Sequence, residues 1–592
     1  MKKLNLLFST LLFCFIIAGC SDQDDSSNNQ NQQNDVKFAE NFGDTVSRNF
    51  IGQIVDVNNS PISNVTIAIG TSTVQTDSNG VFMINGASVR EKFAYITAKK
   101  SGFIDGSRSL VPTSGTNHVK IMMLPQDTLQ TISSGTTSEV SIYSGTKVVF
   151  DGAFQDENGV SYSGAVSVSM FHLTPSEPTI SELMPGMLYA QDLSGQQKTL
   201  ETFGMMNVEL RGSNGQKLQI ASGHTAQISI RLDDAQMASA PSSMPLWHFD
   251  DSLGYWKEEG SVTKQGNYYV GTVSHFSWWN CDAPFPTVTL SMNIVNTTNQ
   301  PLANIRVELV SSNSPYPRTG YSNTQGQVSG LIPANQVLTM TIYSIDICGD
   351  TPISTSTIGP FSTDTTLPTI VIDNPQVAST VVQGTLLKCD NSNVTNGYVL
   401  VHYGNQFYPS PVTNGAFSLA MIYCPSNSNF TLQGFNFNDL QTTSTINYTF
   451  TSPITNIGSL STCNSIAEFI SYQVDSNPLN YIITGITANA GQNQGTITTG
   501  LTIYGYGTET SGQGIYIWGN TNVPGLYTTA QFSIEGSQVG YISIQSINTV
   551  GFNLSQFGAV GEYIDLTFSG TYQDSVGATH TIVGVAHVLR DN

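Results

Sequence analysis

The feature that most constrains the fold is a repeated pattern of short alternating segments separated by turn residues. In the first copy, alternating segments at residues 51–56 and 65–69 flank Pro61, and an Asp-Ser-Asn-Gly turn at residues 77–80 follows. A second copy surrounds Pro301 and the turn at residues 323–326. A third, weaker copy covers residues 394–400 and 413–417. Period-two alternation is typical of strands with one buried face, and Asx-Gly is typical of hairpin turns. The repeats predict tandem β modules, each with its own core.

The first copy resembles the carboxypeptidase regulatory-like domain, a small seven-stranded sandwich. The resemblance covers residues 48–125 and depends on Gly52, the stretch 61–65 and the turn at 77–82. It implies an Ig-like or prealbumin-like β-sandwich. It implies no peptidase activity, because this domain is an accessory in the enzymes that give it its name. We expect the same fold for the two later copies, in residues 283–376 and 377–463.

Two further β-domains are expected. The central segment, residues 126–282, holds four of the five tryptophans, and its last forty residues are similar to an extracellular β-domain of cartilage intermediate layer protein and its bacterial lipoprotein relatives. That similarity implies a fold but no chemistry. Residues 464–592 alternate like another sandwich and resemble the C-terminal domains of flavobacterial lipoproteins. The predicted fold class is all-β, with tandem sandwich modules behind a lipoprotein signal peptide.

The N-terminus has the layout of a signal peptide, predicted for residues 1–19. Two lysines precede an apolar run at residues 4–17, which is too short to span a bilayer comfortably. The sequence Ile-Ala-Gly-Cys at residues 17–20 resembles the bacterial lipobox, in which Cys20 is acylated and becomes the mature N-terminus. The alternative is an ordinary signal peptide with a chance cysteine. The lipobox would supply the acyl chains that stable anchoring needs.

Residues 20–47 are predicted to be a flexible acidic and polar linker. Their Asp, Ser, Asn and Gln side chains bury too little apolar surface to order the chain. Acidic residues directly after the lipobox resemble the surface-export signal of Bacteroidetes lipoproteins. The alternative is a solvated linker in a protein that faces the periplasm. We therefore expect a lipid-anchored outer-membrane protein, with exposure at the cell surface as the favoured orientation.

Charge and motifs exclude several functions. The net charge of −21 argues against nucleic acid or anionic lipid as a partner, because both require a basic patch. The sequence has no HExxH, GxSxG, P-loop or dinucleotide motif, so no enzyme activity and no cofactor are predicted. The Asx-Gly turns at residues 77–80 and 156–159 lack the further carboxylates of a calcium site. No metal site is predicted.

Trp247, Trp256 and Trp279 are the candidate ligand-stacking residues. Trp247 and Trp256 lie near His248 and Asp250, so their rings could stack on a sugar or peptide while the acids accept hydrogen bonds. The alternative is that strand alternation turns these rings into the core. For Trp278 and Trp279, we expect one ring inside and the other outside or at a module junction. His275 is interpreted as a structural hydrogen-bonding residue.

The five cysteines that follow Cys20 suggest disulfides, which are the default in an exported protein. Cys389 and Cys424 lie within one proposed module and are the first candidate pair. Cys281 with Cys348 is a second candidate, which leaves Cys463 unpaired. No two cysteines form a CxxC pair, so a zinc site of that type is not expected.

Three functions remain compatible with the sequence. The first is a surface protein that displays its modules for binding or adhesion, with a glycan or an extracellular protein as the ligand. The second is a structural spacer or assembly subunit of an outer-membrane complex that binds no ligand. The third is a hydrolase whose site is assembled from scattered residues of the central or final domain.

Overall fold

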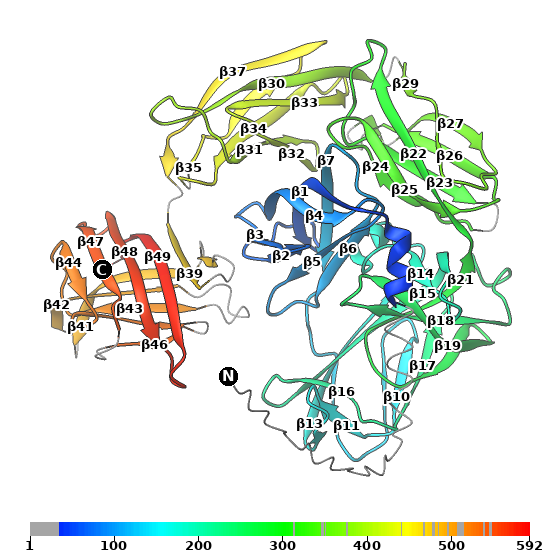
Figure 1. The fold of residues 1–592 in the computed structure, drawn as a ribbon, viewed down its shortest axis with the longest axis horizontal. Helices are drawn as coiled ribbons and strands as arrows, with labels where there is room; N and C mark the ends of the chain where they lie inside the picture. Colours follow the sequence, from blue (N-terminus) through cyan, green and yellow to red (C-terminus); the bar gives the residue numbers. More distant parts are fainter. Residues whose placement is uncertain are drawn as a thin grey trace, which may run out of the picture.

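The computed structural model describes residues 35–591 apart from short gaps at 312–313, 345–347, 350, 375–376, 440, 466–467, 476–479, 483–484, 494–495, 506–513, 537–538 and 544–547. The fold is all-β, as predicted, and consists of β-sandwich modules in series, with a larger β-domain between the first and the second sandwich (Figure 1). The predicted signal peptide, Cys20 and the first part of the linker lie outside the described residues. Within them, no helix is long and apolar enough to cross a membrane.

The first module is a two-layer sandwich built from strand alternation. One sheet has the order β4-β1-β7 and the other the order β3-β2-β5-β6. Strand β1 pairs antiparallel with β4 and parallel with β7. The alternate residues of β2 and β5 that point inward, among them Ile67 and Ile96, are fully buried between the sheets. The strands are β1 (Thr45–Asp56), β2 (Thr66–Ile69), β3 (Ser72–Gln75), β4 (Val81–Arg90), β5 (Ala94–Lys99), β6 (Gly106–Leu110) and β7 (Thr116–Met123).

The second and third sandwiches repeat this topology. Their first strands, β22 and β30, pair antiparallel with β25 and β33 and parallel with β29 and β37. The second sandwich comprises β22 (Thr287–Asn296), β23 (Arg306–Ser311), β24 (Arg318–Tyr321), β25 (Gln327–Pro333), β26 (Leu338–Tyr343), β27 (Pro352–Ile358), β28 (Thr365–Thr366) and β29 (Ile370–Ile372). The third comprises β30 (Ala378–Lys388), β31 (Gly397–Tyr403), β32 (Gln406–Pro411), β33 (Ala416–Tyr423), β34 (Asn429–Asn436), β35 (Gln441–Thr442), β36 (Ile446–Thr449), β37 (Ile454–Thr462) and β38 (Asn464–Ser465).

The hairpin-turn glycines explain why the sequence repeat is visible. Gly80 and Gly326 have φ values of 67° and 71°, a conformation that side-chain-bearing residues rarely adopt. A Cβ at either position would lie 2.3 Å from a main-chain carbonyl oxygen, that of Ile54 or Ile294. Both modules also share a backbone hydrogen bond at this turn: the amide of Ile54 donates to the Gly80 carbonyl, and the amide of Ile294 donates to the Gly326 carbonyl. The turn therefore requires glycine in both copies.

The central domain is a sheet of the order β12-β11-β16-β15-β21-β18-β19-β20-β17-β10-β9. Outside this order, β13 pairs with β15 and β8, and β14 pairs with β15 and β19. A short helix, α2 (Ile180–Leu183), precedes β14. The strands are β8 (Gln130–Ser133), β9 (Ser138–Ser141), β10 (Lys147–Phe150), β11 (Phe154–Asp156), β12 (Ser161–Tyr162), β13 (Ala165–Leu173), β14 (Tyr189–Gln191), β15 (Gln197–Gly212), β16 (Lys217–Ile220), β17 (Ala226–Arg231), β18 (Ser243–Asp250), β19 (Tyr255–Gln265), β20 (Tyr268–Val273) and β21 (Trp278–Phe285).

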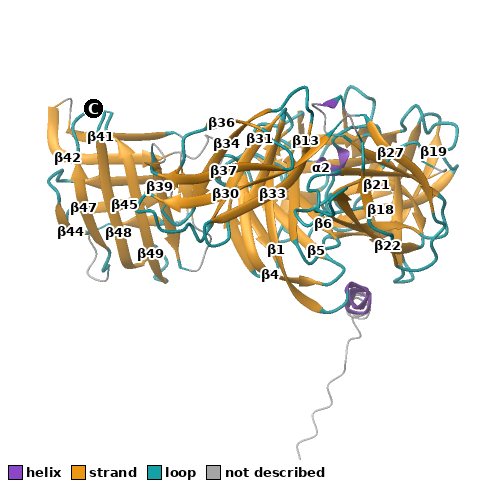
Figure 2. Cartoon of the chain, turned by 90° about the horizontal axis from the view of Figure 1, so that it is seen from above, coloured by secondary structure: helices purple, strands orange, loops and turns teal. Residues whose placement is uncertain are grey.

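The C-terminal sandwich pairs a sheet of the order β40-β39-β49-β48-β47-β44 with one of the order β41-β42-β43-β45-β46. Its core cluster draws its buried residues from positions 470–588 alone. The strands are β39 (Phe469–Val474), β40 (Asn480–Ile482), β41 (Ile486–Asn493), β42 (Thr496–Gly505), β43 (Ile515–Gly519), β44 (Gly525–Thr528), β45 (Phe532–Gly536), β46 (Gly540–Ile542), β47 (Gly551–Phe557), β48 (Tyr563–Gln573) and β49 (Thr579–Leu589). Figures 1 and 2 place it at one end of the molecule.

The first module lies inside an arc formed by the three domains that follow it (Figure 1). The Ser109 hydroxyl donates a 2.7 Å hydrogen bond to the Gly254 carbonyl of the central domain. The Asn323 amide of the second sandwich donates to Thr113 Oγ1 at 2.7 Å. In the third sandwich, the Tyr398 hydroxyl donates to the buried Asp77 carboxylate. The first four domains therefore form one packed body.

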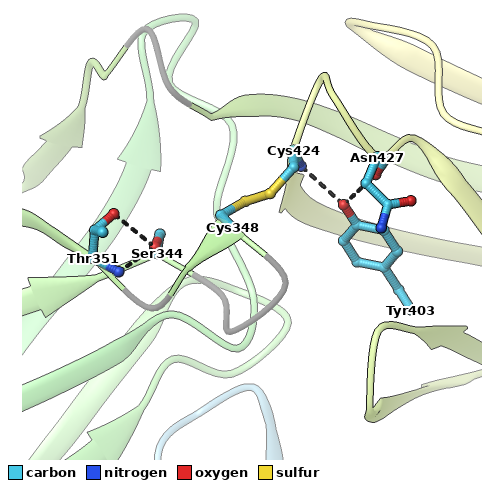
Figure 3. Close-up of a disulfide and its surroundings, with 6 residues drawn as sticks. All are labelled: Ser344, Cys348, Thr351, Tyr403, Cys424 and Asn427. Atoms are coloured by element: carbon cyan, nitrogen blue, oxygen red, sulfur yellow. Dashed lines mark hydrogen bonds between the residues drawn. A yellow bond between two sulfur atoms is a disulfide. The ribbon is translucent and has the colours of Figure 1, made fainter.

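Two disulfides form, and neither is a predicted pair. Cys348 bonds to Cys424, which joins the second sandwich to the third (Figure 3), and Cys389 bonds to Cys463 within the third. The predicted Cys389–Cys424 and Cys281–Cys348 pairs are wrong, as is the unpaired Cys463. Cys389 and Cys463 directly follow β30 and β37, and the parallel pairing of these strands brings their ends together. Cys281 is free and buried in the central domain.

The end of the predicted flexible linker is ordered. Residues 35–42 are helical, ending in the 3-10 turn η1 (Glu40–Phe42), and β1 begins at Thr45. Phe38 packs on Tyr255 of the central domain, with ring centroids 4.7 Å apart, and Phe42 stacks on Phe93 at 4.4 Å. The linker prediction is therefore wrong for residues 35–47, because two phenylalanines give this polar segment an apolar anchor.

Candidate functional site

The three tryptophans predicted to stack on a ligand lie in the core of the central domain. Trp247, Trp256 and Trp279 have no exposed surface. The indole of Trp247 donates to the Asp282 carbonyl at 3.1 Å, and that of Trp279 donates to the His275 carbonyl at 3.0 Å. The stacking hypothesis for these residues is wrong, and the alternative interpretation as core holds.

Packing on both faces of the sheet explains this outcome. Trp278 and Trp279 point to opposite faces, yet each is covered by a different hydrophobic cluster. The cluster that covers Trp278 also contains Trp247 and Trp256, together with Ile104 and Leu124 from the end of the first module. The second ring, that of Trp278, is therefore buried at a module junction, one of the two places expected for it, because the first module covers that face.

A cavity of about 310 Å³ lies where the first module, the central domain and the second sandwich meet. Its charged groups pair across the junction. The Lys120 ammonium lies 3.1 Å from the Glu182 carboxylate. Arg318 is buried, faces Glu201, and donates to the Leu200 carbonyl at 2.5 Å. Burial raises the pKa of Glu201, and the opposing charge of Arg318 counteracts that rise. These charged residues therefore stabilise the contacts between the domains.

An exposed aromatic face lies on the C-terminal sandwich instead. Trp518 is 43% exposed, Tyr516 39% and Tyr541 59%, and all three belong to the sheet that contains β42, β43, β45 and β46. Tyr504 on β42 lies directly opposite Tyr516 on β43, with ring centroids 6.3 Å apart and planes 25° from parallel. We call these four residues the aromatic face.

The strand register arranges polar groups among these rings. Glu535 on β45 lies between Tyr516 and Tyr541 in the same cross-strand row, and its side chain is exposed. In the neighbouring row, Trp518 lies between Thr502 and Ser533. The face therefore combines flat rings with one carboxylate and two hydroxyls.

The core on the opposite side fixes the positions of these strands. Ile503, Ile517 and Ile534 alternate with the outward-facing residues and are fully buried. Because adjacent strand residues point to opposite faces, the same alternation that builds the core presents the aromatic face to solvent. The rings are thus held on a sheet rather than on loops.

The sequence analysis missed the aromatic face. The candidate rings were taken from the tryptophan-dense central segment, residues 126–282. The signal was present, since Tyr516 and Trp518 alternate with Ile515 and Ile517. What it could not show is which strands bring Tyr504 and Tyr541 alongside.

Comparisons by sequence show a distant similarity to cartilage intermediate layer protein 2 of two species. No protein-family model matches the chain. Cartilage intermediate layer protein 2 of Homo sapiens is 28% identical over 123 residues, which is 21% of this chain and 10% of that protein. The Mus musculus protein is 27% identical over 135 residues, or 23% of this chain and 11% of that protein. The match thus spans about a tenth of these relatives, and the predicted distant resemblance is confirmed at that level.

Two of the solved structures with similar segments are a shaft pilin and the TIE protein of Bacillus anthracis. The shaft pilin spaA from Lactobacillus rhamnosus GG matches at 9% identity and a TM-score of 0.16, covering 30% of this chain and 96% of that chain. The Bacillus anthracis TIE protein matches at 8% identity and a TM-score of 0.15, covering 78% of this chain and 72% of that chain. Scores this low support no conclusion about function.

Proposed function

We propose that the protein is a lipid-anchored surface protein of the bacterial outer membrane that binds glycans through the aromatic face of its C-terminal sandwich. The observation that carries the proposal is the exposure of Trp518, Tyr516 and Tyr541 on one sheet. Exposed aromatic rings that cluster on a face, rather than occurring singly, mark interaction sites. The protein performs no catalytic step in this proposal.

The chemistry of the face fits a sugar chain. The C–H faces of a pyranose pack on flat aromatic rings, and its hydroxyls donate to a carboxylate or exchange hydrogen bonds with Ser and Thr hydroxyls. Glu535 supplies the carboxylate within the row of rings, and Thr502 and Ser533 flank Trp518. A row that crosses several strands suits an extended chain rather than a small enclosed molecule.

The sequence supports display outside the cell. The Ile-Ala-Gly-Cys motif at residues 17–20 resembles a lipobox, and acidic residues follow it as in exported Bacteroidetes lipoproteins. The first repeat resembles the carboxypeptidase regulatory-like domain. In this arrangement the anchored end is followed by a packed four-domain body, and the aromatic face lies in the domain farthest along the chain.

A glycan array with the full chain tests the binding. The chain carries Cys20→Ala to remove the predicted acylation, and the comparison variants are Trp518→Ala and Leu526→Ala. Binding to at least one polysaccharide is expected, with an affinity loss of about 30-fold for Trp518→Ala, the size of a binding hot spot. Leu526 is 82% exposed on the other sheet, so Leu526→Ala should bind normally. If no glycan binds and the protein co-purifies with a membrane complex, the spacer function replaces this proposal.

Fractionation of cells tests the anchor separately. Cys20→Ala should move the protein from the membrane pellet to the soluble fraction and abolish incorporation of a labelled fatty acid. Cys14→Ala, within the apolar run of the predicted signal peptide, is the matched control and should leave both unchanged. Protease added to intact cells distinguishes the two orientations, since only a protein at the cell surface is digested.

A further inference from the structure

Two histidines and a glutamate from separate parts of the central domain converge at its surface. His248 lies on β18, Glu259 on β19, and His275 between β20 and β21. Glu259 Oε2 is 3.1 Å from His248 Nδ1 and 3.2 Å from His275 Nε2. One donor atom from each side chain lies within 4.8 Å of the other two. Segments up to 27 positions apart in the chain thus place two imidazoles and one carboxylate around a single point.

These separations are those of ligands around one tetrahedral ion. Zinc binds imidazole nitrogen at about 2.0–2.1 Å and carboxylate oxygen at about 2.0–2.2 Å. Two such ligands at the tetrahedral angle lie about 3.4 Å apart. Both distances measured from Glu259 Oε2 are close to that value, so small side-chain movements would accommodate an ion.

The Nδ1 atom of His248 supports a further ligand at this point. It is buried and, among the described residues, has no hydrogen-bond partner, although the Glu259 carboxylate lies within ion-pair distance. A buried polar atom without a hydrogen bond is costly, and a metal–nitrogen bond would satisfy it.

Neighbouring groups hold the three side chains in place. The ring of Trp279 packs against both imidazoles, at centroid distances of 5.7 Å to His248 and 5.0 Å to His275. The Ser274 hydroxyl donates to Glu259 Oε1 at 3.2 Å, which leaves Oε2 facing the two imidazoles. Such outer contacts orient the ligands of metal sites.

We propose that His248, Glu259 and His275 form a site for a divalent transition metal ion of the Zn²⁺ class. Two imidazoles favour zinc and its neighbours over calcium and magnesium, which prefer oxygen ligands. Glu259 and His275 are 41% and 34% exposed at their side chains, so an ion can enter from solvent and keep a position for water. The ion would tie β18, β19 and the segment before β21 together. The predicted absence of a metal site overlooked this cluster because its ligand spacing follows no short motif.

Titration calorimetry with zinc chloride on the full Cys20→Ala chain tests this site. One tight site is expected, and His248→Ala, Glu259→Gln and His275→Ala should each weaken it at least tenfold. His402→Ala, in the third sandwich, is the matched control and should bind as tightly as the parent chain. Calcium and magnesium should not compete at millimolar concentration.

Cobalt substitution gives an independent readout. Co²⁺ in a site of four ligands should give visible absorption bands that disappear in Glu259→Gln. Circular dichroism in the near ultraviolet verifies that the variants keep their tertiary packing. Zinc binding that is absent, or that survives all three ligand substitutions unchanged, overturns the proposal and leaves the cluster as an ion pair. Neither result affects the proposed glycan binding, which concerns another domain.

Discussion

The first module and the C-terminal sandwich are both two-sheet β-sandwiches, yet neighbouring domains surround the first and leave a sheet face of the second exposed. The first module is enclosed by three neighbours, and Tyr95, Ser109 and Asp77 make their hydrogen bonds across its borders. The C-terminal sandwich has a self-contained core and lies at the end of the molecule, with Trp518 and Tyr541 on its open face. The same architecture therefore serves assembly in one case and offers a surface in the other.

The difference shows that aromatic content alone does not locate a binding face. In the central domain, tryptophans are used to fill the junction with the first module. In the C-terminal sandwich, a single tryptophan remains at the surface because no neighbouring domain covers its sheet in Figures 1 and 2. What decides whether a tryptophan can bind a ligand is whether a neighbouring domain covers the sheet face on which it lies.

The largest difference in stability between the two regions is expected when one tryptophan in each is replaced by alanine. Trp247→Ala removes a fully buried side chain at a domain junction and should lower the free energy of unfolding by about 3–5 kcal/mol. Trp518→Ala removes a half-exposed ring and should cost less than about 1 kcal/mol. Urea unfolding of the full chain measures both. Equal losses would contradict the contrast between junction and open face.

Loss of the inter-sandwich disulfide should weaken the packed body alone. Cys348 and Cys424 are 76 residues apart, and a bridge of that span stabilises a fold by about 2–4 kcal/mol. Cys424→Ser should therefore lower the melting temperature of the four-domain body in calorimetry. The transition of the C-terminal sandwich, which contains no cysteine after Cys463, should not move.

Lowering the pH should stabilise the packed body and destabilise the C-terminal sandwich. Burial raises the pKa of Asp77 to about 6 from 3.8, so its folded form binds a proton more tightly than the unfolded chain. Asp77 alone should therefore cost the packed body up to about 3 kcal/mol of stability as the pH rises from 4 to 6. Asp77→Asn should reduce this loss. Burial also raises the pKa of Asp251 to about 6, so part of the pH dependence should remain.

In the C-terminal sandwich, His580 lowers the pKa of Asp475 through a hydrogen bond. Its stabilising contribution is therefore present above about pH 4 and is lost as the pH falls through the lowered value. Calorimetry across pH 3–7 measures both transitions. Parallel pH profiles for the two regions would contradict this assignment.

The smallest effect is expected at an exposed border of the first module. Lys92 and Asp364 form a 2.7 Å ion pair to the second sandwich, with about half of each side chain exposed. Pairs of this kind contribute about 0–1 kcal/mol. Lys92→Ala should change the urea midpoint barely measurably, and a large loss would show that this border stabilises the body more than its burial indicates.

Local patterns predicted the strands and turns well, because they depend on neighbouring residues. The turn glycines Gly80 and Gly326 could be matched from sequence, and their shared backbone geometry explains why. The alternation predicted for residues 464–592 is observed in strands such as β49. The all-β fold class followed from the same alternation.

Contacts between distant segments could not be predicted. Cys389 was assigned to Cys424 within a module, but the parallel pairing of β30 and β37 places Cys463 beside it. Trp279 could face either way until the covering clusters were known. The cluster of His248, Glu259 and His275 depends on the register of β18 with β19 and the return of the chain into β21.

The two disulfides also limit how far the molecule can stretch. About 115 residues separate Cys348 from Cys463, which could extend by about 400 Å if the chain were pulled straight. The bridges shorten the covalent path between these residues to the 35 residues between Cys389 and Cys424, or about 120 Å at full extension. A protein held at one end and loaded at its C-terminal sandwich, as by flowing liquid, would thus be able to extend over this stretch by only about a third of the length that the unbridged chain allows.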